Sequence, residues 1–303
     1  MGLQLTILTA TYNRADLLPD LYESLLRQNN KQFIWLVVDD GSIDNTFTLV
    51  DNWRNRDNGF EIRIIKQENK GKNMAINRGV LDIDTPYTMI IDSDDYLTDD
   101  AVEFTLEAID SISGLNDFAG ISSMRGTIEA SSNEIKSINH SFKSYIDATN
   151  LERQKYGIKH DCCEAYQTEL LKSHPFKVWE GEKFTPEQVV WNQLAIEGYK
   201  IRWFPKVTCI VRYQEDGLTK DSWNLYKSNP MGYAMMFNHS LKYPQSFKKK
   251  LYSIIQMICC CFISGNIGYI SMSNAPFLSF LLIPIGYALS LRRKLQFIDS
   301  SKH

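Results

Sequence analysis

The sequence predicts an α/β fold in which a mainly parallel central sheet is flanked by helices and followed by a helical C-terminal tail. Two observations predict this fold. In the first hundred residues, short apolar runs typical of strands alternate with segments whose apolar residues recur at helical spacing. Polar clusters directly follow several of the apolar runs, as at the carboxyl edge of a parallel sheet. A chain of 303 residues is long enough to bury the core that such a fold needs.

The predicted elements are clearest in the first third of the chain. Strands are expected at residues 5–10, 33–38, 62–65 and 87–91, and helices at residues 15–28, 44–53 and 73–80. Strands that alternate with helices at this spacing form βαβ units. Beyond residue 99 the pattern is looser, with strands expected at residues 118–123 and 201–213 and a helix at residues 186–197.

Composition excludes some classes of protein. The formal net charge of −3 argues against a nucleic-acid binder of the basic type. The six cysteines show no spacing typical of a zinc site, which indicates small apolar side chains in a reducing compartment. The first residues lack a basic segment and resemble a buried strand rather than a signal peptide, so a cytoplasmic location is expected.

The C-terminal tail contains two apolar runs, at residues 251–263 and 277–291, with basic clusters at residues 248–250 and 292–294. Each run is shorter than the roughly 20 residues that span a bilayer. We therefore expect two interfacial or re-entrant helices whose basic flanks meet anionic headgroups. The alternatives are a helical hairpin packed on the protein's own core, or a spanning segment.

Three carboxylates, Asp92, Asp94 and Asp95, lie within four positions after an apolar run. Such close carboxylates repel one another unless a cation neutralises them. Oxygen ligands suit Mg²⁺ or Mn²⁺, which also take phosphate and water oxygens. The alternative is a solvated acidic loop that caps the next helix.

Two more polar segments follow the same pattern. Asp40 stands in a cluster with Asp44 after the second predicted strand, and a carboxylate there can accept the imide N–H of a base. The alternative is a turn with Asp44 or Ser42 as helix cap, and both can hold at once. Residues 69–73 form a basic glycine turn before a helix, which favours phosphate, although no Walker or dinucleotide motif is present.

Four segments, at residues 11–14, 37–44, 71–79 and 91–95, occur in the order seen in family 2 glycosyltransferases with the GT-A fold, of the type that builds bacterial surface polysaccharides. The resemblance is strong over residues 1–100 and visible to about residue 220. It implies a GT-A domain and an inverting, metal-dependent transferase. The implied donor is a nucleotide-diphosphate sugar, UDP-hexose or UDP-N-acetylhexosamine, and the implied cofactor is Mn²⁺ or Mg²⁺.

The resemblance also assigns roles to individual residues. Near the base it places the backbone of Ala10 and the ring of Tyr12, with Asp40 reading the base edge. Lys72 resembles a pyrophosphate or base-side contact. Asp94 resembles the residue closest to the metal and Asp92 a second ligand toward the ribose, while Asp95 supports the site or contacts the sugar. The implied donor-binding residues are Ala10, Tyr12, Asn13, Asp40, Lys72, Asn77, Asp92 and Asp95, and the implied metal ligands are Asp94 and Asp92.

An inverting transferase needs a general base, and the first candidate is Glu187. Thr185 can cap a helix there, with Pro186 at its first position and Gln188 completing a capping box. The helix start would keep Glu187 ionised. Many relatives carry Glu-Asp at this point, whereas this chain has Glu-Gln, so Glu182 is the second choice and Glu180 remains open.

The resemblance divides the chain into three parts: a nucleotide-sugar-binding half (residues 1–100), an acceptor-binding and catalytic-base half (101–222), and a membrane-associating tail (223–303). The implied acceptor is a polyprenyl-diphosphate-linked saccharide at the cytoplasmic side of the cell membrane, where the enzyme would be peripheral or monotopic. The QxxRW motif of processive synthases is absent, which favours addition of a single sugar. The loop at residues 213–219 resembles one that closes over donor or acceptor, and an ordinary turn explains it almost as well.

Several matters stay open from the sequence. One of them is whether the chain forms a homo-oligomer. The alternative functions are a sugar-nucleotide nucleotidyltransferase, which would normally carry a glycine-rich loop after the first strand, and a non-catalytic membrane-bound binding protein or scaffold. The aspartate clusters favour the transferase over a binding protein or scaffold.

Overall fold

A computed structural model describes residues 2–128, 135–138, 144–212 and 222–299 of the chain. The loop predicted at residues 213–219 lies outside the described residues. The strands are β1 (Leu5–Thr11), β2 (Phe33–Asp39), β3 (Glu61–Lys66), β4 (Tyr87–Ile90), β5 (Tyr96–Leu97), β6 (Phe118–Ile128), β7 (Ile135–Ser137), β8 (Ile146–Ala148), β9 (Cys162–Gln167) and β10 (Lys200–Ile210). All four strands predicted in the first hundred residues are confirmed.

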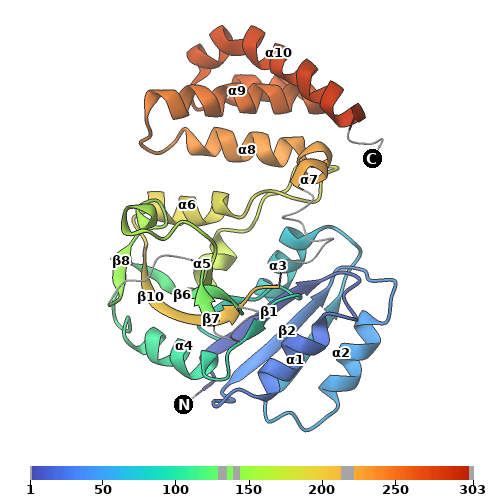
Figure 1. Cartoon of the computed structure of the whole chain (residues 1–303), viewed down its shortest axis with the longest axis vertical. Helices are drawn as coiled ribbons and strands as arrows, with labels where there is room; N and C mark the ends of the chain where they lie inside the picture. The colour runs from blue at the N-terminus through green and yellow to red at the C-terminus, as the bar shows by residue number, and fades with distance from the viewer. Residues whose placement is uncertain (1, 129–134, 139–143, 213–221, 300–303) are drawn as a thin grey trace. The chain divides into compact units, whose positions relative to one another are not determined.

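The helices shown in Figure 1 include the three predicted at the start of the chain. They are α1 (Leu18–Leu26), α2 (Thr46–Arg54), α3 (Lys72–Leu81), α4 (Ala101–Asp110), α5 (Thr168–Ser173), α6 (Gln188–Ile196), α7 (Ser222–Ser228), α8 (Pro230–Ser240), α9 (Phe247–Ser264) and α10 (Pro276–Asp299), with 3-10 turns η1 (Arg153–Tyr156) and η2 (Ile267–Met272). Helix α1 begins later than predicted because Pro19 fits only the first turn of a helix.

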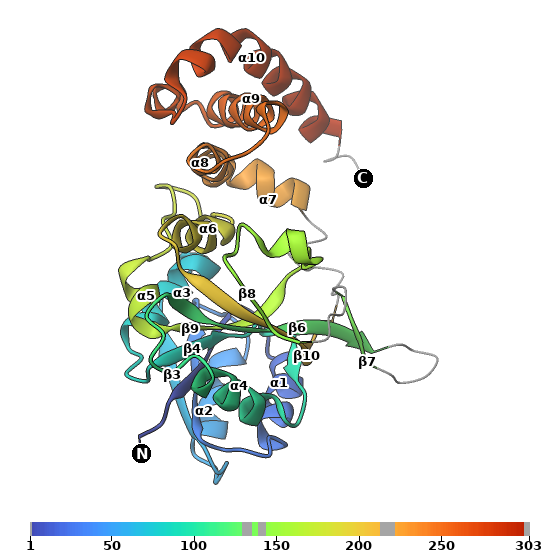
Figure 2. The same ribbon diagram turned by 90° about the vertical axis from the view of Figure 1, so that its left-hand side faces the viewer.

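The strands form one sheet in the order β3-β2-β1-β4-β9-β6-β10-β5, with β7 paired to β6 and β8 to β10. Strands β1 to β4 are parallel, as predicted. Beyond β4 the sheet is mixed, because β9 pairs antiparallel with both β4 and β6. Figure 2 shows helices α1, α2 and α4 on one face of the sheet and α3 and α5 on the other. The fold is therefore α/β with a central sheet flanked by helices, and its parallel half carries the predicted motifs.

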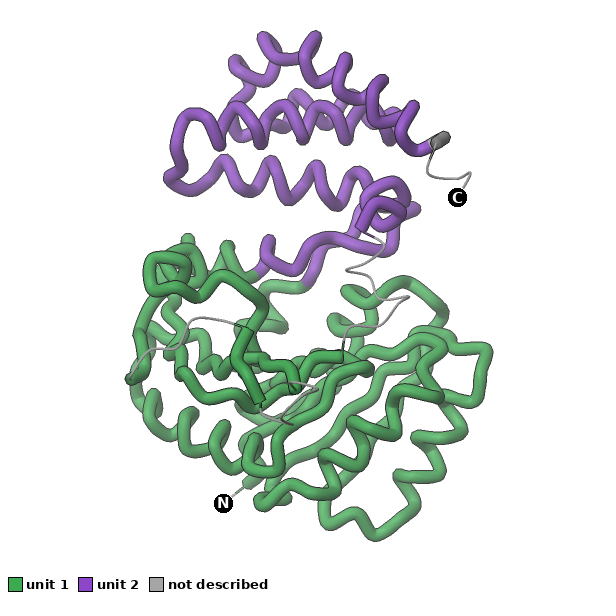
Figure 3. Tube along the Cα trace, in the orientation of Figure 1, with its two compact units in different colours: residues 1–175, 191–214 green, residues 176–190, 215–303 purple. Residues whose placement is uncertain are grey.

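The chain divides into two compact units (Figure 3). The first comprises residues 1–175 and 191–214, and the second comprises residues 176–190 and 215–303. The first unit contains the sheet. The second contains helices α7 to α10 and the segment before α6. The predicted three-part functional division remains a prediction.

The core of the first unit explains why β1 and β2 are nearly continuous apolar runs. Every residue of β2 is buried, and so is nearly all of β1. On one face, the rings of Tyr22 and Trp53 stack with centroids 4.2 Å apart and lie beside Trp35. All six cysteines are free and buried, which confirms that they act as small apolar side chains.

The second unit is a stack of helices in which α9 contacts both α8 and α10. Ser246 caps the start of α9 by accepting from the N–H of Lys249, and Gly265, at a φ of 80°, ends it. The middle of α9, from Ser253 to Cys261, is almost wholly buried. The apolar run at residues 251–263 is thus largely core, and its prediction as an interfacial helix is corrected. No described helix combines the length and the apolar character needed to cross a membrane.

Candidate active site

The register of the parallel strands brings the predicted polar clusters to one edge of the sheet. Thr11 at the end of β1 lies opposite Asp39 at the end of β2, and the next amide, of Asp40, donates to the carbonyl of Thr11 at 2.8 Å. On the other side of β1, the amide of Ile91 donates to the carbonyl of Leu8 at 3.0 Å. The segments after β2 and β4 therefore leave the sheet on either side of β1, at the carboxyl edge where α/β sheets bind ligands.

Asn13 joins the loop after β1 to the loop after β2. Its backbone N–H donates to Ser42 Oγ at 2.9 Å, and its Oδ1 accepts from the N–H of Ile43 at 2.9 Å. Its φ of 52° lies in the left-handed region, which asparagine tolerates better than most residues. Beside it the ring of Tyr12 is 44% exposed, and Ala10 is half-buried in β1. Asn13 thus shapes the loop, while Tyr12 presents a ring at the sheet edge.

The alternative of Asp44 or Ser42 as the N-cap of α2 is wrong, because the N-cap is Asn45, but Asp44 still bonds the start of the helix. Its carboxylate accepts from the N–H of Thr46, the first residue of α2, at 3.0 Å, and from the N–H of Ala15 at 3.1 Å. Partial burial would raise the pKa of Asp44, but these hydrogen bonds outweigh it and lower the pKa. Asp44 therefore orders the start of α2 and ties it to the loop after β1.

Asp40 organises the basic glycine turn. Its Oδ1 accepts from Gln67 Nε2 at 2.7 Å and from the N–H of Lys70 at 2.8 Å, and its Oδ2 accepts from the N–H of Gly71 at 2.8 Å. The side chain is only 3% exposed. Asp40 therefore holds the turn in place, a role that the sequence did not indicate. Its role in reading a base stays a prediction.

Gly41 allows this close approach. It has a φ of 80°, and a Cβ there would lie 2.8 Å from the backbone nitrogen of Asn69. Only glycine combines that backbone conformation with so small a space. The turn at residues 67–71 can therefore pack directly against the end of β2.

Lys72 follows this turn as the first residue of α3, and its Nζ lies 2.6 Å from Asp92 Oδ1. Arg125 of β6 approaches from the other side, with Nη1 3.4 Å from Asp92 Oδ2 and 3.0 Å from Asp95 Oδ2. Arg125 also donates to the carbonyl of Cys162 through Nε at 3.0 Å. Sequence reasoning missed Arg125. The available signal was a single arginine at the end of an otherwise apolar, strand-like run.

The three acidic residues after β4 differ in charge environment. Burial would raise the pKa of Asp92, but Lys72 and Arg125 outweigh it and hold that pKa well below the usual range. Burial, together with the charge of Asp92, raises the pKa of Asp94. Burial raises the pKa of Asp95 to about 7; Arg125 opposes this rise, and the other two carboxylates add to it. Positive charge thus outweighs burial at Asp92, whereas burial outweighs positive charge at Asp94 and Asp95.

The predicted clusters are joined by a continuous set of contacts. Asp40 binds the amide of Gly71, and the next residue, Lys72, binds Asp92. The acidic residues after β2 and after β4 therefore face the same glycine-lysine turn. On the same helix α3, Asn77 is half-buried with Nδ2 3.7 Å from Met74 Sδ.

A metal site was predicted at Asp94 and Asp92. Within the described residues, no group of three or more His, Cys, Asp or Glu side chains is arranged to hold a metal ion. Both oxygens of Asp92 face cations, whereas no salt bridge to Asp94 occurs in the described part of the chain. Asp94 is therefore the carboxylate whose chemistry best fits a divalent ion, with further ligands to come from outside the protein.

The base candidates have distinct surroundings in the second unit. Glu182 accepts from the N–H of Met231 at 2.7 Å and of Gly232 at 2.8 Å, at the start of α8. Burial raises the pKa of Glu182, and these hydrogen bonds oppose the rise. Glu187 immediately precedes α6, and Glu180 is exposed. Glu182 thus has a structural role as a cap of α8, and Glu187 stays the first candidate.

The predicted capping box at Glu187 is wrong in its details. Helix α6 begins at Gln188, two residues later than predicted, because the N–H of Val189 bonds the carbonyl of Pro186 in a tighter turn. The side-chain amide of Gln188 lies 2.7 Å from Met236 Sδ. Further along α6, the indole of Trp191 stacks on the ring of Tyr166 of β9 with centroids 4.3 Å apart.

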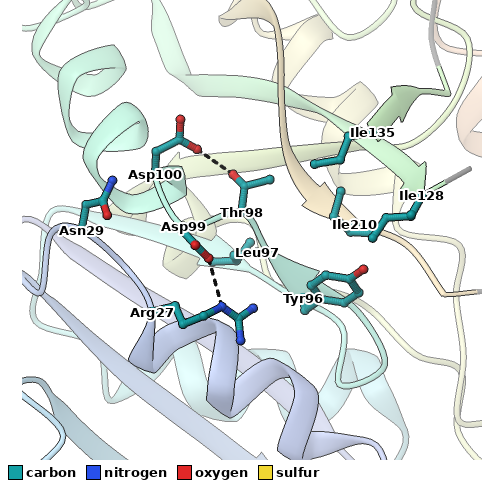
Figure 4. Close-up of a pocket in the computed structure, with 10 residues that line it drawn as sticks. All are labelled: Arg27, Asn29, Tyr96, Leu97, Thr98, Asp99, Asp100, Ile128, Ile135 and Ile210. Atoms are coloured by element: carbon teal, nitrogen blue, oxygen red, sulfur yellow. Dashed lines mark hydrogen bonds and ion pairs between the residues drawn. The ribbon is translucent and has the colours of Figure 1, made fainter. Parts of the chain in front are cut away.

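A pocket of about 450 Å³ lies elsewhere in the first unit, near the ends of β5 and β10 (Figure 4). Its walls include Ile128, Ile135 and Ile210, and the ion pair of Arg27 with Asp99 at 3.1 Å. None of the predicted donor-binding residues lines it. The pocket is therefore separate from the candidate site.

Comparison with known proteins identifies the family. Residues 6–174 match the family model described as "Glycosyl transferase family 2". The chain belongs to glycosyltransferase family 2. The matched range contains every predicted donor-binding residue and ends before the base candidates.

Two curated relatives of this family 2 member come from staphylococci. The poly-beta-1,6-N-acetyl-D-glucosamine synthase of Staphylococcus aureus is 26% identical over 68% of this chain and 49% of its own length. The teichoic acid poly(glycerol phosphate) polymerase of Staphylococcus epidermidis is 34% identical over 37% of this chain and 16% of its own length. The chain thus spans about half the length of the first relative, and less of the second.

Two solved structures share the fold. Staphylococcus aureus TarS 1-349, in complex with UDP-GlcNAc, has a TM-score of 0.62 at 15% identity and covers 97% of this chain and 92% of its own. The mannosyltransferase PcManGT of Pyrobaculum calidifontis, in complex with GDP-Man and Mn²⁺, has a TM-score of 0.59 at 16% identity. The match covers 96% of this chain and 81% of PcManGT. The predicted GT-A fold is confirmed.

Proposed function

We propose that this family 2 glycosyltransferase moves a single sugar, with inversion, from a UDP-sugar to a lipid-linked saccharide during synthesis of a bacterial surface polysaccharide. One observation carries the proposal. The Gly71–Lys72 turn touches Asp40 on one side and Asp92 on the other. Asp40, the start of α3 and the acidic cluster therefore share one edge of the sheet, which supports a site where they would read the base and hold the diphosphate of a nucleotide.

The donor to test first is UDP-N-acetylglucosamine, with UDP-hexose second. The TarS structure contains UDP-GlcNAc, and the first curated relative is named for a polymer of N-acetylglucosamine. The PcManGT structure contains GDP-Man, so a GDP-sugar should be tested beside the UDP-sugars as an alternative donor. Asp40 and the exposed ring of Tyr12 are the proposed base contacts.

The donor diphosphate would lie against Lys72 and the first amides of α3, where the helix dipole favours negative charge. We propose that Mn²⁺ or Mg²⁺ is held by Asp94 together with Asp92, and that it neutralises charge on the departing diphosphate. Asp94 fits this role because, within the described residues, it has no salt bridge, and because burial, together with repulsion from Asp92, raises its pKa.

Glu187 is the proposed general base. It would take the proton of the acceptor hydroxyl as that oxygen bonds to the anomeric carbon, while the bond from carbon to the diphosphate oxygen breaks on the opposite face. The released product is then UDP. Glu182 is second choice, since both its oxygens already bind amides of α8, and Glu180 is third.

The acceptor is proposed to be a polyprenyl-diphosphate-linked saccharide at the cytoplasmic side of the membrane, with the enzyme peripheral or monotopic. The relatives named as a polysaccharide synthase and a teichoic acid polymerase support a surface polymer as the pathway's product. The proposal that a single sugar is added rests on the absence of the QxxRW motif of processive synthases.

The experiment is a donor screen with the full chain, Mn²⁺ and a polyprenyl-linked acceptor. Release of nucleotide diphosphate and the product mass are measured together. UDP-N-acetylglucosamine is expected to give UDP and a product heavier by one residue. A ladder of products would indicate polymerisation, and pyrophosphate instead of UDP would indicate a nucleotidyltransferase. No release from any UDP- or GDP-sugar would refute the proposal.

The base is tested with Glu187→Gln. Donor affinity and thermal stability are expected to stay near wild type, while transfer falls by about a hundredfold or more. Glu180→Gln is the matched control and should keep its rate. Glu182→Gln should lower the melting temperature, because its carboxylate binds two amides of α8. A normal rate for Glu187→Gln would move the base to Glu182 or Glu180.

A further inference from the structure

Helix α10 packs on the rest of the second unit partly through small residues and leaves several large apolar side chains exposed. Its buried positions against the rest of the second unit include Ser279, Gly286 and Ser290. A Cβ on Gly286 would lie 2.4 Å from Ile258 Cγ2 of α9, so small residues permit the two helices to pack closely. In a water-facing helix the large apolar side chains point toward the core. Here small residues share that place with Leu278, Leu282, Ile283 and Phe297, which also pack on the core of the second unit.

Six other large apolar side chains of α10 face outward. Phe277 is 74% exposed, Phe280 72% and Leu295 65%, and Leu281, Ile285 and Leu291 are also exposed. Counted from Phe277, the other five lie 3, 4, 8, 14 and 18 residues further along, which are distances that return to one side of a helix. From Pro276 to Leu291 the helix contains no Lys, Arg, Asp, Glu or His. We call these six side chains the α10 face. An apolar stripe of this length is far more than scattered surface residues explain.

Charge around the α10 face has a single sign. Lys248 and Lys249 are exposed at the start of α9, and Arg292 and Lys294 are exposed in the last turns of α10. Between Phe247 and Asp299, the sequence contains no carboxylate other than that of Asp299. Basic residues beside an apolar stripe complement anionic headgroups, whereas a second copy would bring like charges together.

We propose that the α10 face is a membrane-docking surface that lies in the plane of an anionic bilayer, with Phe277, Phe280 and Leu281 inserted among the acyl chains. Helix α9 stays in the protein core, as its burial shows. This inference deepens the membrane part of the proposed function. It replaces the expectation of two interfacial helices by one docking helix supported on a buried one.

The test is binding of the full chain to vesicles, measured by co-sedimentation without donor or acceptor. Wild type is expected to bind phosphatidylglycerol-containing vesicles and to bind pure phosphatidylcholine vesicles more weakly. The double variant Phe277→Ser/Phe280→Ser should lose at least about tenfold in partitioning. Leu81→Ser, which removes a comparably exposed apolar side chain (66%) from α3 of the first unit, is the matched control and should bind as wild type.

Two further variants separate the apolar and ionic contributions. Phe280→Leu keeps an apolar side chain and should retain binding. Lys248→Gln/Lys249→Gln/Arg292→Gln should lose about tenfold on anionic vesicles and little on neutral ones. Thermal melting confirms that each variant is folded.

Several results would overturn the inference. These are no vesicle binding by wild type, unchanged binding by the Phe277→Ser/Phe280→Ser variant, or loss of binding by folded Phe280→Leu. A dimer in solution that this double variant dissociates, without vesicle binding, would assign the α10 face to a second copy. Because no sugar donor is present, failure here leaves the transfer reaction untouched, and an inactive enzyme that still binds leaves docking untouched.

Discussion

Three aspartates within four positions acquire three different environments. Their presence after a strand is visible in the sequence, and so is the need for positive charge. Which cation compensates which carboxylate is not visible, because Arg125 comes from β6, about thirty residues further along the chain. Its guanidinium reaches Asp92 and Asp95 only after β6 and β9 have joined the sheet.

Replacing Arg125 with Met should destabilise the protein by about 3–5 kcal/mol, since it leaves buried carboxylates uncompensated. Arg63→Met is the control. Arg63 pairs with Glu61 at 2.8 Å on an exposed part of β3, so its loss should cost less than about 1 kcal/mol. Urea unfolding at pH 7.5 measures both. Equal losses would show that the buried pairing has no special weight.

His239 of α8 predicts a pH dependence of the second unit. Burial, with a smaller effect of Lys242, lowers the pKa of His239 to about 4. The unfolded state takes up a proton below about pH 6.5, whereas the folded state does so only near pH 4. The stability that depends on neutral His239 is therefore complete above pH 6.5 and is lost as pH falls toward 4.

Between pH 7.5 and 5 this loss should amount to about 2 kcal/mol. Thermal melting of wild type and His239→Gln at the two pH values measures it. The variant should melt at more similar temperatures at both pH values than wild type does. An unchanged pH dependence in His239→Gln would show that His239 is already accessible to protons in the folded protein.

At the scale of elements, the alternation of apolar runs predicted β1 to β4 and α1 to α3. In that part of the chain, the spacing of apolar residues in the sequence matches the residues that are buried in each strand and helix. The short strands β5, β7 and β8 were missed. Each has two or three residues and exists through pairing with a distant strand, so no local pattern marks it. Helix α9 was predicted to be interfacial, and its burial between α8 and α10 could not be seen from its own sequence.

Close packing of α9 and α10 depends on Gly286. Gly286→Ala should cost about 1–3 kcal/mol through overpacking against Ile258, reduced by alanine's better helix propensity. Gly268→Ala in η2 is the matched control, because a Cβ there meets nothing within 4 Å. Its effect should stay within about 0.5 kcal/mol. Thermal melting compares the two variants. Equal stability would mean that α10 shifts away from α9 without penalty.

At the scale of the whole molecule, parallel strands explain why motifs far apart in sequence share one site. Their carboxyl ends meet at one edge, so segments after β1, β2 and β4 must be neighbours. The second half of the sheet is mixed and its order could not be read from the sequence. The family match covers residues 6–174, which include the predictable parallel strands and the mixed strands through β9, and it ends near the start of the second unit.

Metal removal tests the charge balance of the complete enzyme. EDTA is expected to reduce transfer by about a hundredfold or more, and Mn²⁺ or Mg²⁺ to restore it. Asp94→Asn should need much more Mn²⁺ for half-maximal rate, as measured by metal titration of UDP release. Full activity in EDTA would contradict a metal at Asp94 and would assign neutralisation of the diphosphate to Lys72 and Arg125.

The sequence by itself determined the parallel half of the sheet and the Asp, Gly and Lys residues at its carboxyl edge, because strand period and chain order are local properties. Only the tertiary structure decided that Asp40 holds the Gly71 turn, that Arg125 pairs with Asp92 and Asp95, that Glu182 caps α8 and that α10 leaves several large apolar side chains exposed. Each of these depends on contacts between segments that are distant in sequence. Which face of a helix or strand becomes buried is set by the segments that pack against it.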